Sequence, residues 1–239
     1  MFFILALWAL ISEFVFVDSF LFPSPTKVIF RFFELLFKME IVPDIISTLL
    51  KIFTAISIGS AFGFISGVVI SLRTSVYDAI SPVMDFFRSI PGTALFPLFL
   101  LIFGAGDQSN ILLAAWVCAL YLSLHVSKGF RSTSEAALIT AKSLKKTELE
   151  TIIHVRFKEA LPLIFVGFRI ATSLTVVLVI VTEMFVGTKN GIGKVLIDAS
   201  YTYDISKLYS MIFAIGFIGY LLNHVILKLE QTIVHWHGK

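Results

Sequence analysis

The sequence contains little charge and a single cysteine. Only 15% of its 239 residues are charged, and the formal net charge is +3, whereas an average soluble protein contains about 25% charged residues. A net charge this small argues against a nucleic-acid partner, because such partners select strongly basic surfaces. Cys118 lies within an apolar run and forms no intrachain disulfide, so it says little about the compartment.

Motifs for catalysis, metal binding and nucleotide binding are also missing. No nucleophile lies at a recognisable spacing from a base, the histidines lack metal-ligand spacing, and no phosphate-cradling loop is visible. We therefore expect no catalytic residues, no metal and no cofactor on this chain. The sequence also contains no ATP-binding motif.

Apolar residues dominate what is present. They make up 57% of the chain, 25 residues are Phe, and the mean hydropathy is +0.93. A membrane-spanning helix needs roughly 20 mostly apolar residues, and this pattern predicts an all-α, polytopic membrane helical bundle. The six predicted spans are Phe2 to Val17, Ile45 to Leu72, Ile80 to Phe103, Ile111 to Val126, Leu161 to Val186 and Leu208 to Leu229. The first is short, and a signal peptide is the alternative, although a basic start and a small-residue cleavage site are missing.

Basic residues concentrate in the loop between the fourth and fifth predicted spans. This loop contains Lys128, Arg131, Lys142, Lys145, Lys146, Arg156 and Lys158. Such a loop is expected in the cytoplasm, and with six spans both termini then lie in the cytoplasm. We expect three parts: residues 1–40 with a transmembrane helix and an interfacial amphipathic helix, a transmembrane core at 41–232, and a cytoplasmic tail at 233–239. Lys27, Arg31 and Lys38 would form the polar face of the interfacial helix.

The most informative segment runs from Ile139 to Ile170. It is basic and helix-forming, lies between apolar runs, and contains Leu161-Pro162 before the chain becomes apolar again. This layout resembles the cytoplasmic coupling loop in the permease subunit of bacterial type I ABC importers, where an EAA-type motif is gripped by the ATPase. Counting back from Leu161-Pro162 with the family's spacing assigns ATPase coupling to Ile139, Thr140, Ala141, Lys142, Ser143, Leu144, Lys145 and Lys146.

The coupling motif is diverged. A literal Glu135-Ala136-Ala137 is present at the wrong spacing, and we interpret it as a decoy. Lys145 stands where the family has Gly, and Phe157-Lys158 replaces the first Leu-Pro. These departures distinguish the segment from the family's usual coupling motif.

Further segments extend the resemblance from about Trp8 to Leu229. LFPSPT at 21–26 resembles the LPSP motif of a permease subgroup that imports nitrate, bicarbonate, sulfonates such as taurine, or thiamine precursors. FFRSIPGTALFPLFLLIFGAG at 86–106 and TEMF at 182–185, followed by NGIG at 190–193, resemble other family segments. Glycines at 59, 63 and 67 share one helix face and predict close helix packing.

Charged residues inside the predicted spans define a candidate pathway. Arg88 lies in an apolar span whose backbone is opened by prolines. It either lines an anion pathway or simply pairs with Asp85, three residues away. Glu183 is expected near the outer end of its span, where charge costs less. The candidate pathway residues are Asp85, Arg88, Ser89, Pro91 and Glu183.

The resemblance implies a type I ABC importer permease fold with a cytoplasmic coupling helix, in the bacterial cytoplasmic membrane. It implies a translocation pathway for a small anionic nutrient of the nitrate, bicarbonate or sulfonate type. The implied partners are the lipid bilayer, a second permease subunit (identical or distinct), two ABC ATPase subunits that bind ATP, and a periplasmic or lipid-anchored solute-binding protein. The alternatives are an ATP-independent secondary transporter or channel, which internal inverted repeats would favour, and a membrane enzyme, which the lack of catalytic motifs disfavours.

Overall fold

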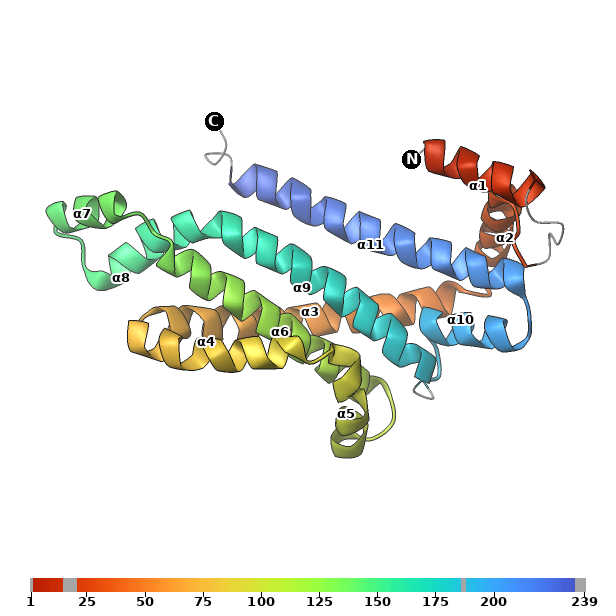
Figure 1. Ribbon diagram of the computed structural model, residues 1–239, viewed down its shortest axis with the longest axis horizontal. Helices are drawn as coiled ribbons and strands as arrows, with labels where there is room; N and C mark the ends of the chain where they lie inside the picture. The colour runs from red at the N-terminus through yellow and green to blue at the C-terminus, as the bar shows by residue number, and fades with distance from the viewer. Residues whose placement is uncertain (1, 15–20, 186–187, 235–239) are drawn as a thin grey trace.

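The computed structural model describes residues 2–14, 21–185 and 188–234, and regular structure in these residues is entirely helical. Four long helices run along the molecule: α3 (Val42–Ser71), α6 (Asp107–Arg131), α9 (Phe157–Phe185) and α11 (Ile205–Ile233) (Figure 1). Each is long and apolar enough to span a membrane, α9 as part of a continuous stretch from Glu148 to Phe185. The predicted all-α membrane bundle is therefore confirmed.

Helices α3 and α6 form the tightest contact of the bundle, because glycines remove the side chains between them. A Cβ atom at Gly59 would lie 2.6 Å from the carbonyl oxygen of Ala115, and one at Gly67 would lie 2.6 Å from that of Ser123. Gly63, between them, faces α6 in the same way. The expected role of these glycines in close helix packing is confirmed.

The predicted span from Ile80 to Phe103 is not one straight helix. It consists of α4 (Thr74–Ser89), a 3₁₀ turn η1 (Gly92–Leu95) and α5 (Phe96–Phe103), with a bend of 87° between the two parts. Pro91 lies at the break, where it restricts the preceding residue to an extended conformation and Ile90 has ψ 121°. The described residues thus contain four spans, or five if this bent pair counts as one.

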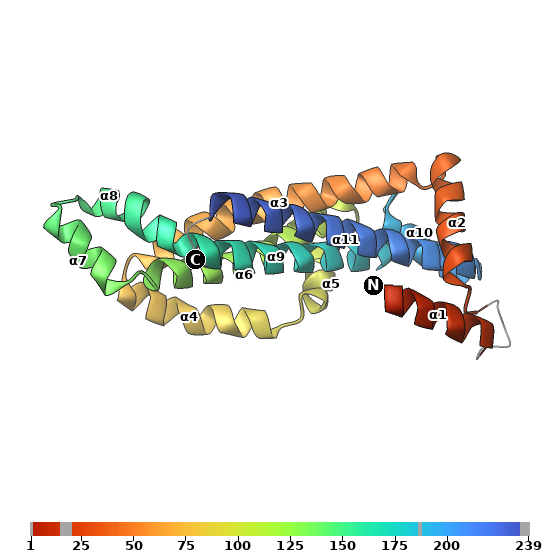
Figure 2. The same ribbon diagram turned by 90° about the horizontal axis from the view of Figure 1, so that it is seen from above.

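The N-terminal segments lie at one end of the bundle. Helix α1 (Phe2–Phe14) has 13 residues and is about 20 Å long, shorter than the roughly 30 Å hydrocarbon core; the last part of its predicted span, residues 15–17, lies outside the described residues. Helix α2 (Pro25–Phe37) begins with Pro at its first position, as expected, and lies across the bundle axis (Figure 2).

Ion pairs fix α2 in place. Arg31 contacts Glu34 at 2.8 Å and Asp204, which precedes α11, at 3.5 Å. Hydrogen bonds from Lys38 and Arg31 lower the pKa of Glu34. A short helix that the sequence did not reveal, α10 (Ile192–Tyr201), lies at this same end of the molecule (Figure 1).

A helical hairpin projects from the opposite end of the bundle (Figure 1). It contains α7 (Glu135–Ser143), α8 (Glu148–Thr151) and a π-helical turn, η2 (Ile152–Arg156), that leads into α9. The sequence predicts a coupling helix from Ile139 to Lys146, but α7 begins four residues earlier and ends three residues earlier. The start is displaced because Ser134 caps the helix, accepting a hydrogen bond from the Ala137 amide.

Candidate functional site

A cavity lies where the broken span meets α6 and α9. Its volume is about 210 Å³, and Arg88, Pro91 and Gly92 line it from the break. Trp116 and Tyr121 of α6 line it too, and the α9 wall is formed by Leu174, Val177 and Leu178. One cation therefore stands at the edge of a mostly apolar chamber, an arrangement suited to a small anion.

Only some of the donors of the Arg88 guanidinium have hydrogen-bond partners among the described residues. Nη1 lies 3.3 Å from Oδ1 of Asp85, so the predicted pair between these residues forms. The guanidinium also stacks over the Tyr121 ring, with 5.4 Å between Cζ and the ring centroid. Its Nε is buried and has no hydrogen-bond partner among the described residues. The Asp85 side chain is 60% exposed, so this pair contributes at most about 1 kcal/mol to stability.

The other candidate pathway residues divide between two places. Ser89 and Pro91 are exposed on the chain surface beside Arg88, and the Ser89 hydroxyl donates a hydrogen bond to the Asp85 carbonyl. Glu183 does not line this cavity. It is only 1% exposed and lies in a separate polar network near the C-terminal end of α9. The expectation that Glu183 sits near the end of its helix is correct, but the carboxylate is fully buried.

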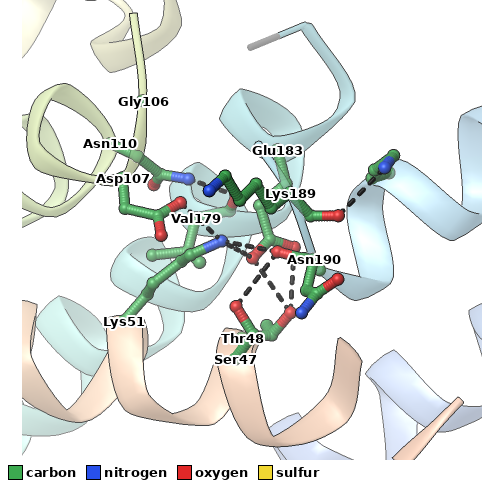
Figure 3. A network of polar contacts seen from close by, with 12 residues as sticks. Ser47, Thr48, Lys51, Gly106, Asp107, Asn110, Val179, Glu183, Lys189 and Asn190 are labelled. Atoms are coloured by element: carbon green, nitrogen blue, oxygen red, sulfur yellow. Dashed lines mark hydrogen bonds and ion pairs between the residues drawn. The ribbon is translucent and has the colours of Figure 1, made fainter. Parts of the chain in front are cut away.

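Lys51 is the partner of Glu183, although no sequence pattern predicted a role for it (Figure 3). Its Nζ lies 3.0 Å from Glu183 Oε1, 2.9 Å from Asp107 Oδ1 and 2.9 Å from the Asn190 carbonyl oxygen. These three acceptors match the three donors of an ammonium group. Lys51 is the one charged residue in the predicted span from Ile45 to Leu72, and this is the signal that could have revealed the site, because intramembrane charges require partners.

The same network caps α10. Glu183 Oε2 accepts a hydrogen bond from the Gly193 amide at 3.0 Å, and Thr48 Oγ1 accepts one from the Ile192 amide at 2.9 Å. A carboxylate at a helix N-terminus also interacts favourably with the helix dipole. A Cβ at Gly191 would lie 2.5 Å from the Glu183 carboxyl carbon. The network therefore fixes the loop between α9 and α10 against α3.

The hairpin presents an apolar surface. Ile139 and Leu144 are 63% and 66% exposed, and Leu149 of α8 is 67% exposed. Ala141, by contrast, is only 2% exposed and packs inside the hairpin. Thr140, Lys142, Ser143 and Lys145 are exposed, and Lys146 is half-buried.

Lys145 adopts φ 50°, in the left-handed region where glycine is the least costly residue. The amides of Lys145 and Lys146 bond to the carbonyls of Lys142 and Ala141, which closes the end of α7. The residue at the expected glycine position therefore has the backbone conformation that glycine favours.

Several known proteins are similar to this chain in sequence. The chain is 25% identical over 237 residues to the putative aliphatic sulfonates transport permease protein SsuC of Bacillus subtilis (strain 168), covering 98% of this chain and 85% of SsuC. It is 25% identical to the taurine transport system permease protein TauC of Escherichia coli (strain K12), covering 81% of this chain and 70% of TauC. The nitrate import permease protein NrtB of Synechocystis sp. (strain ATCC 27184 / PCC 6803 / Kazusa) is also 25% identical, with 80% and 69% covered.

Solved structures agree on the fold. A chain of the MetNI methionine ABC transporter in an inward-facing conformation superimposes with a TM-score of 0.71 at 19% identity, covering 80% of this chain and 95% of that chain. The family described as "Binding-protein-dependent transport system inner membrane component" matches residues 59–233. This multi-pass membrane chain therefore belongs to that family, as a permease subunit of an ABC importer.

Proposed function

We propose that this permease subunit imports a small anionic nutrient, and that Arg88 at the break between α4 and η1 contributes to its pathway. The relatives are named for aliphatic sulfonates, taurine and nitrate, all anionic or carrying an anionic group. A guanidinium recognises the planar or tetrahedral oxyanions of such solutes through paired donors. Asp85 and Ser89 complete the polar surface around Arg88, Pro91 opens the backbone beside it, and Glu183 belongs to the structural network at the end of α9.

The exposure of the Asp85–Arg88 pair carries this proposal. The Arg88 side chain is 36% exposed and the Asp85 side chain 60% exposed on the surface of this chain. Charged side chains facing hydrocarbon are costly and normally face a bundle interior or a water-filled path. The α4 surface with Arg88 therefore turns away from lipid, toward a pathway shared with a second permease subunit, identical or distinct.

In this proposal the hairpin couples transport to ATP hydrolysis by the ATPase subunits. Four large apolar side chains are exposed on a segment that projects out of the bundle: Ile139, Leu144, Leu149 and Ile153. Exposed apolar residues grouped on a projecting element favour a protein partner. Two ATPase subunits that bind and hydrolyse ATP would dock at such hairpins, and the permease would receive its solute from a separate binding protein. In this arrangement the hairpin and the C-terminal end of α11 lie in the cytoplasm, and the N-terminus lies there too if α1 forms a sixth span beyond the five.

Replacement of Arg88 tests the pathway role. We expect Arg88→Gln to reduce solute-stimulated transport by about tenfold or more, the scale of one lost charge-assisted hydrogen bond, with unchanged accumulation and basal ATP hydrolysis. Transport is measured in vesicles that contain the chain and its genomic neighbours. The matched variant Lys27→Gln removes an exposed cation of α2 that lies outside both the cavity and the coupling loop, and it should transport normally.

The double variant Asp85→Asn/Arg88→Gln separates the two roles of Arg88. If Arg88 only neutralises Asp85, removal of both charges restores transport. Full transport by this double variant would overturn the pathway role.

A further inference from the structure

A second basic pocket lies at the base of the coupling hairpin, where α3 ends, α4 begins and α6 leaves the bundle. Its volume is about 230 Å³, and Arg131 and Arg156 both line it. The remaining lining includes the hydroxyl side chains of Ser71, Thr74 and Thr133. The pocket is distinct from the cavity at Arg88, with which it shares no lining residue.

Both guanidiniums lack a carboxylate. No ion pair in the described part of the chain involves Arg131 or Arg156. Nε of Arg156 is buried without a hydrogen-bond partner among the described residues. Arg131 is held in position instead by the Tyr77 ring, 4.2 Å from its Cζ, and by Thr74 Oγ1 at 3.4 Å. Two oriented cations that share a pocket without a counter-charge favour an anionic ligand.

The backbone adds donors to the same place. Thr74 is the first residue of α4, and the side chain of the N-cap residue, Arg73, makes no capping hydrogen bond. Its first amides and the positive end of the helix dipole are therefore available to an anion. Thr74 Oγ1 accepts from Arg131 and donates to no group among the described residues. Arg156 ends the π-helical turn η2, a type of distortion that occurs often at functional sites.

We propose that this pocket binds a phosphate group, supplied either by an anionic phospholipid headgroup or by a soluble phosphate. Paired guanidiniums, a free hydroxyl and an uncapped helix N-terminus are all donors suited to phosphate oxygens. The volume of about 230 Å³ is below the roughly 300–1,000 Å³ of pockets that enclose drug-sized molecules, so it fits a headgroup rather than a nucleotide. Occupancy would join the α3–α4 turn to the base of the hairpin.

Native mass spectrometry of the full chain in a phosphate-free detergent tests the proposal. The probes are inorganic phosphate, dioleoyl phosphatidylglycerol and dioleoylglycerol, which has the same acyl chains without phosphate. We expect one saturable adduct with inorganic phosphate or with phosphatidylglycerol, and weaker binding of dioleoylglycerol. Saturable phosphate binding identifies a soluble ligand, and binding of phosphatidylglycerol alone identifies a lipid headgroup; either supports the proposal.

The variants Arg156→Gln and Arg131→Gln should each weaken that adduct by about tenfold to a hundredfold, the scale of a lost hydrogen bond from a charged group. Because the two residues lie on different helices, one variant remains informative if the other misfolds. Lys158→Gln, which removes an exposed cation two residues from Arg156, should bind normally. The proposal is overturned if no phosphate probe binds, if dioleoylglycerol binds as tightly as phosphatidylglycerol, or if Lys158→Gln weakens binding as much as Arg156→Gln.

Discussion

At the residue scale, the charged residues within the spans differ in burial and in whether their hydrogen-bonding groups have partners. Lys51 and Glu183 are both almost fully buried, and every donor of the ammonium group has an acceptor. Arg88 and its partner Asp85 are both partly exposed, and Nε of Arg88 has no hydrogen-bond partner among the described residues. A satisfied buried pair stabilises a structure, whereas an unsatisfied cation beside a cavity is available to a ligand.

The Lys51–Glu183 pair predicts a strongly coupled mutant cycle. Lys51→Met should destabilise the chain by about 3–5 kcal/mol, because it leaves the buried Glu183 carboxylate without its counter-charge. Glu183→Gln should cost less, because Lys51 keeps Asp107 at 2.9 Å. The double variant should be more stable than Lys51→Met alone. Thermal unfolding in detergent measures these values, with the exposed Lys189→Gln as a neutral control; additive effects would contradict the coupling.

At the element scale, helices α3 and α6 depend on the absence of side chains between them. A Cβ at Gly67 would lie 2.6 Å from both the Ser123 carbonyl oxygen and the Val126 Cβ. Backbone atoms cannot move aside as a flexible side chain can, so these helices would have to separate. Gly216, in the long helix α11, provides the contrast, because a Cβ added there would have no atom within 4 Å.

These two glycines predict opposite effects of alanine. Gly67→Ala should destabilise the chain by about 1–3 kcal/mol through overpacking. Gly216→Ala should be neutral or stabilise the isolated chain by up to about 1 kcal/mol, because alanine has the higher helix propensity. Thermal unfolding of the purified chain in detergent compares them. Equal destabilisation by both would show that packing between α3 and α6 is not the cause.

The hairpin is the second element with a specific test. Ile139→Asp places a charge on an exposed apolar surface, so the chain should accumulate normally while solute-stimulated ATP hydrolysis falls at least tenfold. Ala141→Asp should impair both, because Ala141 is only 2% exposed and a carboxylate there disrupts the hairpin itself. Ala136→Asp, on the exposed start of α7, should be mildest. If it were the most severe, the literal Glu135-Ala136-Ala137 would be the coupling motif.

At the scale of the whole molecule, the two ends of the bundle differ in chemistry. The hairpin lies at one end, and α2 and α10 lie toward the other (Figures 1 and 2). The basic pocket is lined by residues next to the hairpin, and the Lys51 network contacts the first residues of α10. Helix α11 runs from the α10 end toward the hairpin end. The last described residues therefore lie toward the end that the basic residues of the hairpin loop predict to be cytoplasmic.

This arrangement predicts opposite accessibility of the two ends in cells. Single cysteines at Ser143 and Asn190, in a Cys118→Ala background, should react differently with a membrane-impermeant thiol reagent. Ser143 is exposed on the hairpin, and Asn190 is exposed at the other end. Asn190→Cys should be labelled from outside and Ser143→Cys only after permeabilisation. The reverse pattern would invert the proposed orientation.

Hydropathy and length determined the class of this protein and the approximate position of each long helix, because both are local properties of a chain in lipid. The family's motif spacing put Lys145 at a glycine position, and this residue has the left-handed backbone conformation that glycine favours. Local patterns predicted that prolines interrupt the span that contains Arg88, but they did not predict the 87° bend between α4 and α5. The size of a bend depends on the helices that pack against both parts.

Only the tertiary structure paired Lys51 with Glu183, which are 132 residues apart in sequence. It alone showed that Ala141 is buried while Ile139 is exposed, and it alone brought Arg131 and Arg156 into one pocket. The physical reason is common to all three cases. A sequence specifies which residues need partners or burial, whereas the packing of distant helices decides which partner each residue meets.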